Sequence, residues 1–197
     1  MRTSFRLTQV AGFDIQVWLL TASDPEPSLW VRASEVVADL RRARKGSTST
    51  FRILAVTDGG APNAIQRKQM NEVAMGGAHV KSAIITTAAA NPIKRGIATA
   101  IQWLNPEFRI FAPQEAGRAF EHIGIAQAHV DSIWETLQSM QATMPPVEAL
   151  RVATLQLGFP LPKPQAPPAA AASSPAASGD YRGRTCPPRP RASIPSK

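Results

Sequence analysis

Alternation of apolar and polar residues at the start of the chain predicts two β-strands. Residues 4–10 and 13–21 each place apolar side chains at every second position, the spacing of a half-buried strand. Gly12 interrupts the alternation between them. Two such runs joined by a short Ala-Gly connection predict a β-hairpin.

Three further apolar runs predict strands. Residues 51–56, a short β-branched run, and residues 79–87 predict buried strands, and residues 108–111 predict a third, short strand. The first is followed by Thr57-Asp58-Gly59-Gly60, a sequence typical of a turn.

Apolar residues at helical spacing predict five helices, and residues 147–157 could form a last short one. The pattern in the second of these includes Ile65 among its apolar positions, together with Met70, Val73 and Ala74. Asn91-Pro92 is a strong helix start, because proline suits the first helical position. The expected helices cover residues 28–45, 63–75, 91–104, 113–123, 130–140 and 147–157.

Strands that alternate with helices predict an α/β fold with right-handed crossovers. We expect a single mixed, partly parallel sheet of about five strands. The α/β domain is expected to cover residues 1–143, and residues 144–159 form a short C-terminal helix or linker. Residues 160–197 contain ten prolines and little apolar surface, which predicts a disordered tail.

The distribution of charge changes the interpretation of the composition. The 197-residue chain has a net charge of +8, and 44% of its residues are hydrophobic. The tail carries six Lys or Arg against Asp180 alone, whereas residues 1–159 carry 16 basic against 13 acidic residues. The basicity therefore argues for at most a weak nucleic-acid contact through the tail, with no basic footprint on the domain.

The chemistry-bearing residues form no pattern typical of an enzyme. Cys186 is the only cysteine, so an internal disulfide and a structural zinc cluster are ruled out. No paired carboxylate spacing accompanies His122 and His129, and no phosphate-binding or nucleophile motif occurs. We expect a cytoplasmic protein with no membrane span, no metal, no cofactor and no enzymatic activity.

Several segments resemble the bacterial STAS-like proteins, the sulfate transporter and anti-sigma-factor antagonist family. The resemblance covers about residues 4–142 and implies a regulatory domain that binds another protein. Phosphorylated antagonists of that family carry a serine in the turn where this chain has Thr57-Asp58. Thr57 offers a hydroxyl there, but the role of kinase substrate does not carry over. The similar segments are Phe51-Arg-Ile-Leu-Ala-Val-Thr-Asp58, Gln66-Arg67-Lys68, Pro92-Ile-Lys-Arg-Gly-Ile-Ala-Thr-Ala-Ile-Gln-Trp-Leu104 and Phe108-Arg-Ile-Phe-Ala-Pro-Gln-Glu-Ala116.

Two loops are the candidate functional surface. Residues 57–62 and 86–92 each follow a predicted strand and precede a helix, and such loops gather at the carboxyl edge of a parallel sheet. The candidate binding residues are Thr57, Asp58, Gly59, Arg67, Lys94 and Arg95. The cations among them have a simpler interpretation as solvated surface residues.

Two classes of function follow from this surface. The first is a non-enzymatic protein-interaction module that binds a protein partner through these loops, with Asp58→Ala and Arg95→Ala expected to weaken binding and leave the fold intact. The alternative is a protein that binds a small apolar or anionic, lipid-like ligand, which would need a lined cavity.

Overall fold

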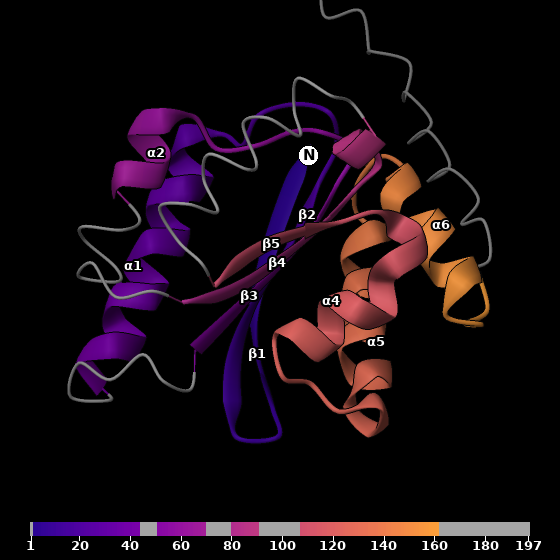
Figure 1. Ribbon diagram of the computed structural model, residues 1–197. Helices are drawn as coiled ribbons and strands as arrows, with labels where there is room; N and C mark the ends of the chain where they lie inside the picture. Colours follow the sequence, from indigo (N-terminus) through magenta and orange to yellow (C-terminus); the bar gives the residue numbers. More distant parts are fainter. Residues whose placement is uncertain (1, 44–50, 70–79, 91–106, 162–197) are drawn as a thin grey trace, which may run out of the picture. The chain divides into compact units, whose positions relative to one another are not determined.

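A computed structural model describes residues 2–43, 51–69, 80–90 and 107–161 (Figure 1). Its strands and helices follow one another in the predicted order. Within the described residues, short 3-10 turns at Thr87–Ala90, Pro113–Glu115 and Gln127–His129 lie between them. The principal elements are β1 (Thr3–Val10), β2 (Phe13–Leu20), α1 (Pro27–Ala43), β3 (Phe51–Thr57), α2 (Ala64–Gln69), β4 (Lys81–Thr86), β5 (Phe108–Phe111), α4 (Ala116–His122), α5 (Val130–Gln141) and α6 (Glu148–Gln156).

The five strands form one mixed sheet in the order β1-β2-β3-β4-β5. β1 pairs with β2 antiparallel, and β2, β3, β4 and β5 are mutually parallel. The predicted α/β class with a partly parallel sheet is therefore confirmed. The predicted helix over residues 91–104 lies outside the described residues.

The predicted hairpin is present and has a two-residue turn. Val10 pairs with Phe13, which leaves Ala11 and Gly12 as the connection. Both have positive φ, 51° and 81°. A turn with two left-handed residues matches the right-handed twist of the strands it joins, which explains why the hairpin is this tight.

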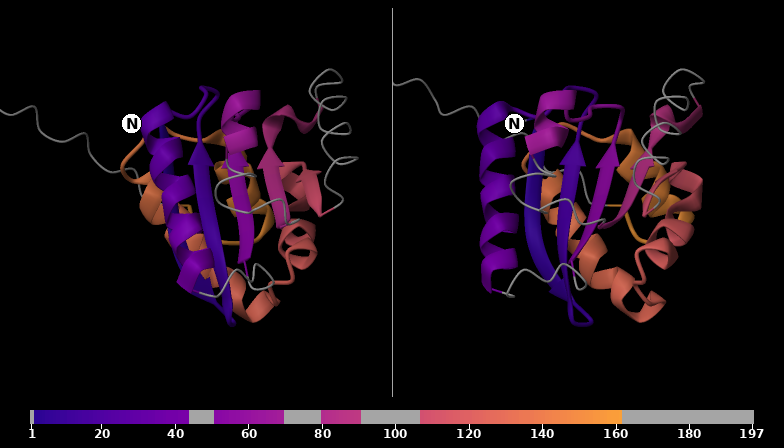
Figure 2. Two further views of the ribbon diagram at one scale, coloured as in Figure 1. Left: turned by 90° about the vertical axis from the view of Figure 1, so that its left-hand side faces the viewer. Right: turned by 60° about the vertical axis from the view of Figure 1, so that its left-hand side comes forward.

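Helices cover both faces of the sheet (Figures 1 and 2). α1 and α2 lie on one face, and α4, α5 and α6 lie on the other. Alternate residues of β2 divide accordingly: Ile15, Val17 and Leu19 belong to the core cluster under α4–α6, whereas Trp18 and Leu20 belong to the cluster under α1. This burial on both faces is typical of parallel strands.

A buried polar side chain joins α1 to the sheet. Gln16 is fully buried, and its Nε2 donates to the Ala33 carbonyl at 3.2 Å. Its Oε1 accepts the Trp18 indole N–H at 3.0 Å, so the amide is satisfied on both sides. Because a buried amide without partners would be costly, these bonds determine how α1 sits on β2.

Trp18, Trp30 and Trp134 are buried in the core. Phe5, Trp18 and Trp30 form a row with ring centroids 5.2 and 5.1 Å apart. The Trp30 indole N–H donates to the Gln66 carbonyl at 2.7 Å, which ties α1 to α2. The fourth tryptophan, Trp103, lies outside the described residues.

The C-terminal helix belongs to the folded unit. α6 contacts β3 and buries Ala149, Leu150 and Ala153 in the core. Residues 1–163 form one compact unit. The proposed disorder of residues 160–197 falls almost entirely outside the described residues and stays a prediction. Among the described residues, no helix has the length and apolar character needed to cross a membrane.

Candidate functional site

The loops after β3 and β4 lie next to each other, as the parallel topology predicts. Thr57 and Thr86, the last residues of the two strands, are register partners. One residue further along, the Thr87 hydroxyl donates to Asp58 Oδ1 at 3.5 Å, a long and weak hydrogen bond. The described part of the two loops therefore forms one surface at the carboxyl edge of the sheet.

Thr57 is buried beneath this surface and stabilises the turn that forms it. Its side chain is buried, its hydroxyl donates to the Gly60 carbonyl at 2.7 Å, and it accepts the Gly59 N–H at 3.0 Å. The hydroxyl thus closes the turn by hydrogen bonding to the backbone around it. A kinase could reach this oxygen only if the turn opened.

Two features of the turn require glycine: another segment approaches Gly60 closely, and Gly59 has a positive φ. The N–H of Gly60 donates to the Thr21 carbonyl at 3.1 Å. A Cβ atom on Gly60 would lie 2.1 Å from the Ser23 carbonyl oxygen and 2.5 Å from that of Thr21. Gly59 has a φ of 117°, a conformation that residues with a Cβ rarely adopt.

Asp58 caps a helix that lies 90 residues further along the chain. Its Oδ2 accepts the Glu148 N–H at 2.7 Å, and its Oδ1 accepts the Ala149 N–H at 2.8 Å. These are the first two amides of α6, whose own N-cap residue, Val147, has no side chain that could accept them. The carboxylate therefore satisfies donors that α6 cannot satisfy itself.

A second carboxylate, that of Glu148, lies in the first turn of α6 and is held by a different partner. Arg151 donates to both of its oxygens, at 2.7 and 2.6 Å. The Arg151 hydrogen bonds lower the pKa of Glu148. Both acidic groups at this helix start are thus engaged in bonds that stabilise α6.

These bonds revise one expectation. Asp58→Ala was expected to leave the fold intact, but the substitution removes the cap of α6. This role is hard to predict from the sequence, because nothing near Asp58 in the chain points to residues 148 and 149. The one signal is negative: α6 follows Pro145-Pro146-Val147, which lacks a capping side chain.

The start of α2 continues the same surface. Asn63 and Gln66 form a capping box, in which each side-chain oxygen accepts the other residue's N–H at 2.9 Å. Arg67 folds back and donates to the Pro62 carbonyl. Arg67 therefore lies at the loop after β3, as predicted, whereas Lys94 and Arg95 lie outside the described residues.

In α2, the apolar pattern of the sequence does not match the burial of the side chains. Ile65, an apolar position of the predicted stripe, is 79% exposed, and Gln66 is buried in its place. The reason is the bonding of Gln66: its Nε2 donates to the Pro25 carbonyl at 3.2 Å, and its own carbonyl accepts from Trp30. These bonds turn Gln66 toward α1 and Ile65 toward solvent.

The described part of this surface offers hydroxyls, backbone groups, the engaged carboxylates of Asp58 and Glu148, the Arg67 guanidinium and the exposed side chain of Ile65. Among residues 2–43, 51–69, 80–90 and 107–161, no cluster of three or more His, Cys, Asp or Glu could hold a metal ion. No family model, curated protein or solved structure matches the chain.

Proposed function

We propose that the chain is a non-enzymatic regulatory module that binds a protein partner through the α2 surface. This surface comprises the turn at Asp58–Gly60, the side chain of Ile65 and the side chain of Arg67. The proposal also draws on the resemblance of residues 4–142 to STAS-like proteins, whose regulatory members act by binding other proteins. A cytoplasmic location is part of the proposal.

The observation that carries the proposal is the exposure of Ile65 on a preorganised surface. A single exposed aliphatic residue is common on monomers and proves little by itself. Here the backbone that presents Ile65 is held on both sides, by the Asn63–Gln66 capping box and by the turn that Thr57 closes. A rigid surface loses little conformational entropy when it binds, so an apolar anchor on it is effective.

The charges around Ile65 specify the partner further. Arg67 and Lys68 follow it on α2 and add positive charge beside the apolar side chain. An apolar anchor within a charged rim is the usual anatomy of a protein interface. We therefore propose a partner with an apolar pocket and an acidic rim, whose rate of association falls as salt increases.

Site-specific photocrosslinking tests this proposal. A photoreactive residue at position 65 should capture one defined protein in the source cell, whereas the same residue at Leu155 should not. Leu155 is a matched control because it is also apolar and exposed, 54% on α6. The captured protein is then purified and its affinity measured against Ile65→Ser and Leu155→Ser.

The expected result is a loss of affinity for Ile65→Ser alone. Burying an aliphatic side chain contributes about 1.5–3 kcal/mol, so affinity should fall at least tenfold. The melting temperature of both variants should stay that of the wild type, because both side chains face solvent. Equal capture at the two positions, or equal affinity of the two variants, would contradict the proposal.

A further inference from the structure

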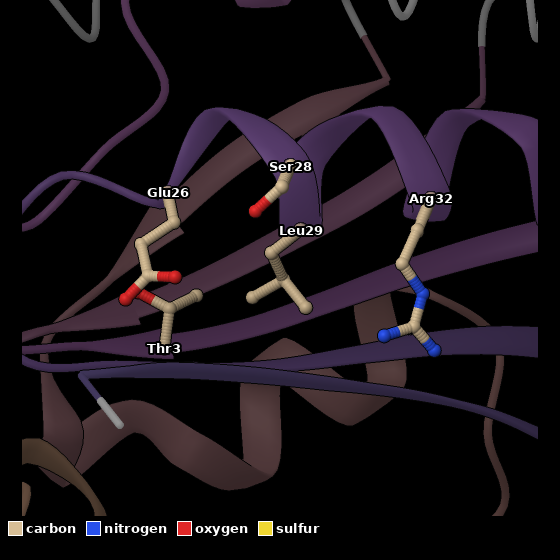
Figure 3. Close-up of a pocket in the computed structure, with 5 residues that line it drawn as sticks. All are labelled: Thr3, Glu26, Ser28, Leu29 and Arg32. Atoms are coloured by element: carbon tan, nitrogen blue, oxygen red, sulfur yellow. The ribbon is translucent and has the colours of Figure 1, made fainter. Parts of the chain in front are cut away.

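A groove runs between the start of α1 and the first residue of β1 (Figure 3). It has a volume of about 310 Å³. Because Thr3 pairs with Leu20, the last residue of β2, the groove opens at the carboxyl edge of β2. Its lining residues are Thr3, Glu26, Ser28, Leu29 and Arg32.

The floor of the groove contains a hydroxyl that lacks a partner. Thr3 is 2% exposed, and its Oγ1 forms no hydrogen bond with any described residue. Figure 3 shows the side chain rising from the strand toward the Glu26 carboxylate and the first turn of α1. A buried hydroxyl without a partner is costly, and a polar group placed in the groove could relieve that cost.

The two charged residues of the groove are also unpaired. Neither the Glu26 carboxylate nor the Arg32 guanidinium forms an ion pair with any described residue. They form no ion pair with each other. Figure 3 shows Leu29 between them, with Thr3 and Ser28 on the Glu26 side.

We propose that this groove binds a small zwitterion whose cationic and anionic groups flank an apolar segment. The cation would donate to the Glu26 carboxylate and to the hydroxyl oxygens of Thr3 and Ser28. The anion would accept the paired N–H groups of the Arg32 guanidinium, whose geometry suits a carboxylate. The apolar segment would lie on Leu29.

This ligand class uses every group that lines the groove. A purely anionic ligand would lie beside the Glu26 carboxylate, and a purely cationic one would lie beside Arg32. A lipid-like apolar ligand would leave the charged and hydroxyl groups without partners, which disfavours it. The inference does not rest on the proposed protein interaction, since Ile65 is not among the lining residues.

Titration of the full chain with 6-aminohexanoate tests the inference. This probe joins an ammonium and a carboxylate by an aliphatic chain, and n-hexylamine and hexanoate each lack one of the two charges. We expect saturable amide shifts in the nuclear magnetic resonance spectrum at residues 3 and 28–32 with the zwitterion. Hexylamine and hexanoate should bind at least tenfold more weakly.

Four variants test which residues contribute. Glu26→Gln and Arg32→Gln should each weaken binding about tenfold, the effect of losing one charge-assisted hydrogen bond. Glu35→Gln is the matched control, because Glu35 is exposed on α1 outside the groove and should leave the affinity unchanged. Thr3→Val should weaken binding while the melting temperature holds or rises, because the orphaned hydroxyl is removed.

Three results would overturn the inference. The first is the absence of saturable shifts at residues 3 and 28–32 over the millimolar range. The second is binding of hexanoate or hexylamine as tightly as the zwitterion, which would show that one charge suffices. The third is equal affinity of Glu26→Gln, Arg32→Gln and Glu35→Gln, which would place binding elsewhere.

Discussion

Removing the Asp58 carboxylate should release the start of α6. In Asp58→Ala, the Glu148 and Ala149 amides lose the acceptors that lie 2.7 and 2.8 Å away. Val147 cannot replace them, since its side chain has no acceptor. We expect α6 to fray from its first turn in the folded protein and to contribute less to the core.

The size of this effect can be estimated from the contacts. Loss of a helix cap costs about 1 kcal/mol and up to about 2 kcal/mol. The negative charge at the helix start adds about 0.3–1 kcal/mol. Water can reach the exposed end of the site, which lowers the sum, so we expect Asp58→Ala to cost about 2 kcal/mol. Asp58→Asn keeps one acceptor and loses the charge, and should cost about 1 kcal/mol.

Urea denaturation followed by tryptophan fluorescence measures this loss. Trp134 reports on α6, because its indole N–H donates to Thr154 at 3.2 Å and its ring stacks on Phe159 with centroids 5.6 Å apart. A cost of about 2 kcal/mol corresponds to a fall in melting temperature of about 4–8 °C in a domain of this size. In Asp58→Ala, the rate of hydrogen exchange should also increase more at the amides of α6 than at those of α5.

Asp24→Ala is the control for the Asp58 variants. Asp24 is an exposed aspartate in the loop before α1, and it forms no hydrogen bond or ion pair with any described residue. The reasoning fails if Asp58→Ala unfolds at the same urea concentration as Asp24→Ala. It also fails if the two variants show the same exchange rates in α6, because the cap would then contribute nothing.

One further substitution and one truncation test the packing of the domain. Gly60→Ala should destabilise the protein by several kcal/mol, since its Cβ would lie 2.1 Å from a backbone oxygen that cannot move without shifting the loop after β2; an unchanged urea midpoint would show that this loop yields easily. Truncation after Lys163 should leave the melting temperature within a few degrees, because residues 1–163 form one compact unit; loss of cooperative unfolding would show that the tail packs on the domain.

Local patterns predicted the parts of the fold that depend on local physics. Alternation over residues 4–10 and 13–21 predicted the hairpin, and β-branched runs predicted the central strands. Strands separated by helices then predicted a sheet with parallel pairs, and the structure shows β2 with β3, β3 with β4 and β4 with β5 as those pairs. The adjacency of Asp58 and Thr87 follows from that topology alone, because the ends of neighbouring parallel strands meet at one edge of the sheet.

The errors arise where long-range hydrogen bonds decide the outcome. The apolar pattern of residues 63–75 includes Ile65, yet the structure buries Gln66 and exposes Ile65. The bonds responsible reach Pro25 and Trp30, which are 41 and 36 residues away in the chain. A helical pattern ranks side chains by polarity, and it cannot show that the Gln66 side chain has a buried hydrogen-bond acceptor 41 residues away.

Asp58 shows how one residue can suit two interpretations. An acidic residue at the end of a central parallel strand lies where ligands usually bind, so the topology favours a binding role. The same position faces the start of a helix that packs on that edge, where a carboxylate is equally favoured as a cap. Both of its oxygens accept α6 amides, so a partner that replaced those hydrogen bonds with its own would compete with α6. Binding of that kind would loosen α6, whereas binding at Ile65 would leave the cap in place.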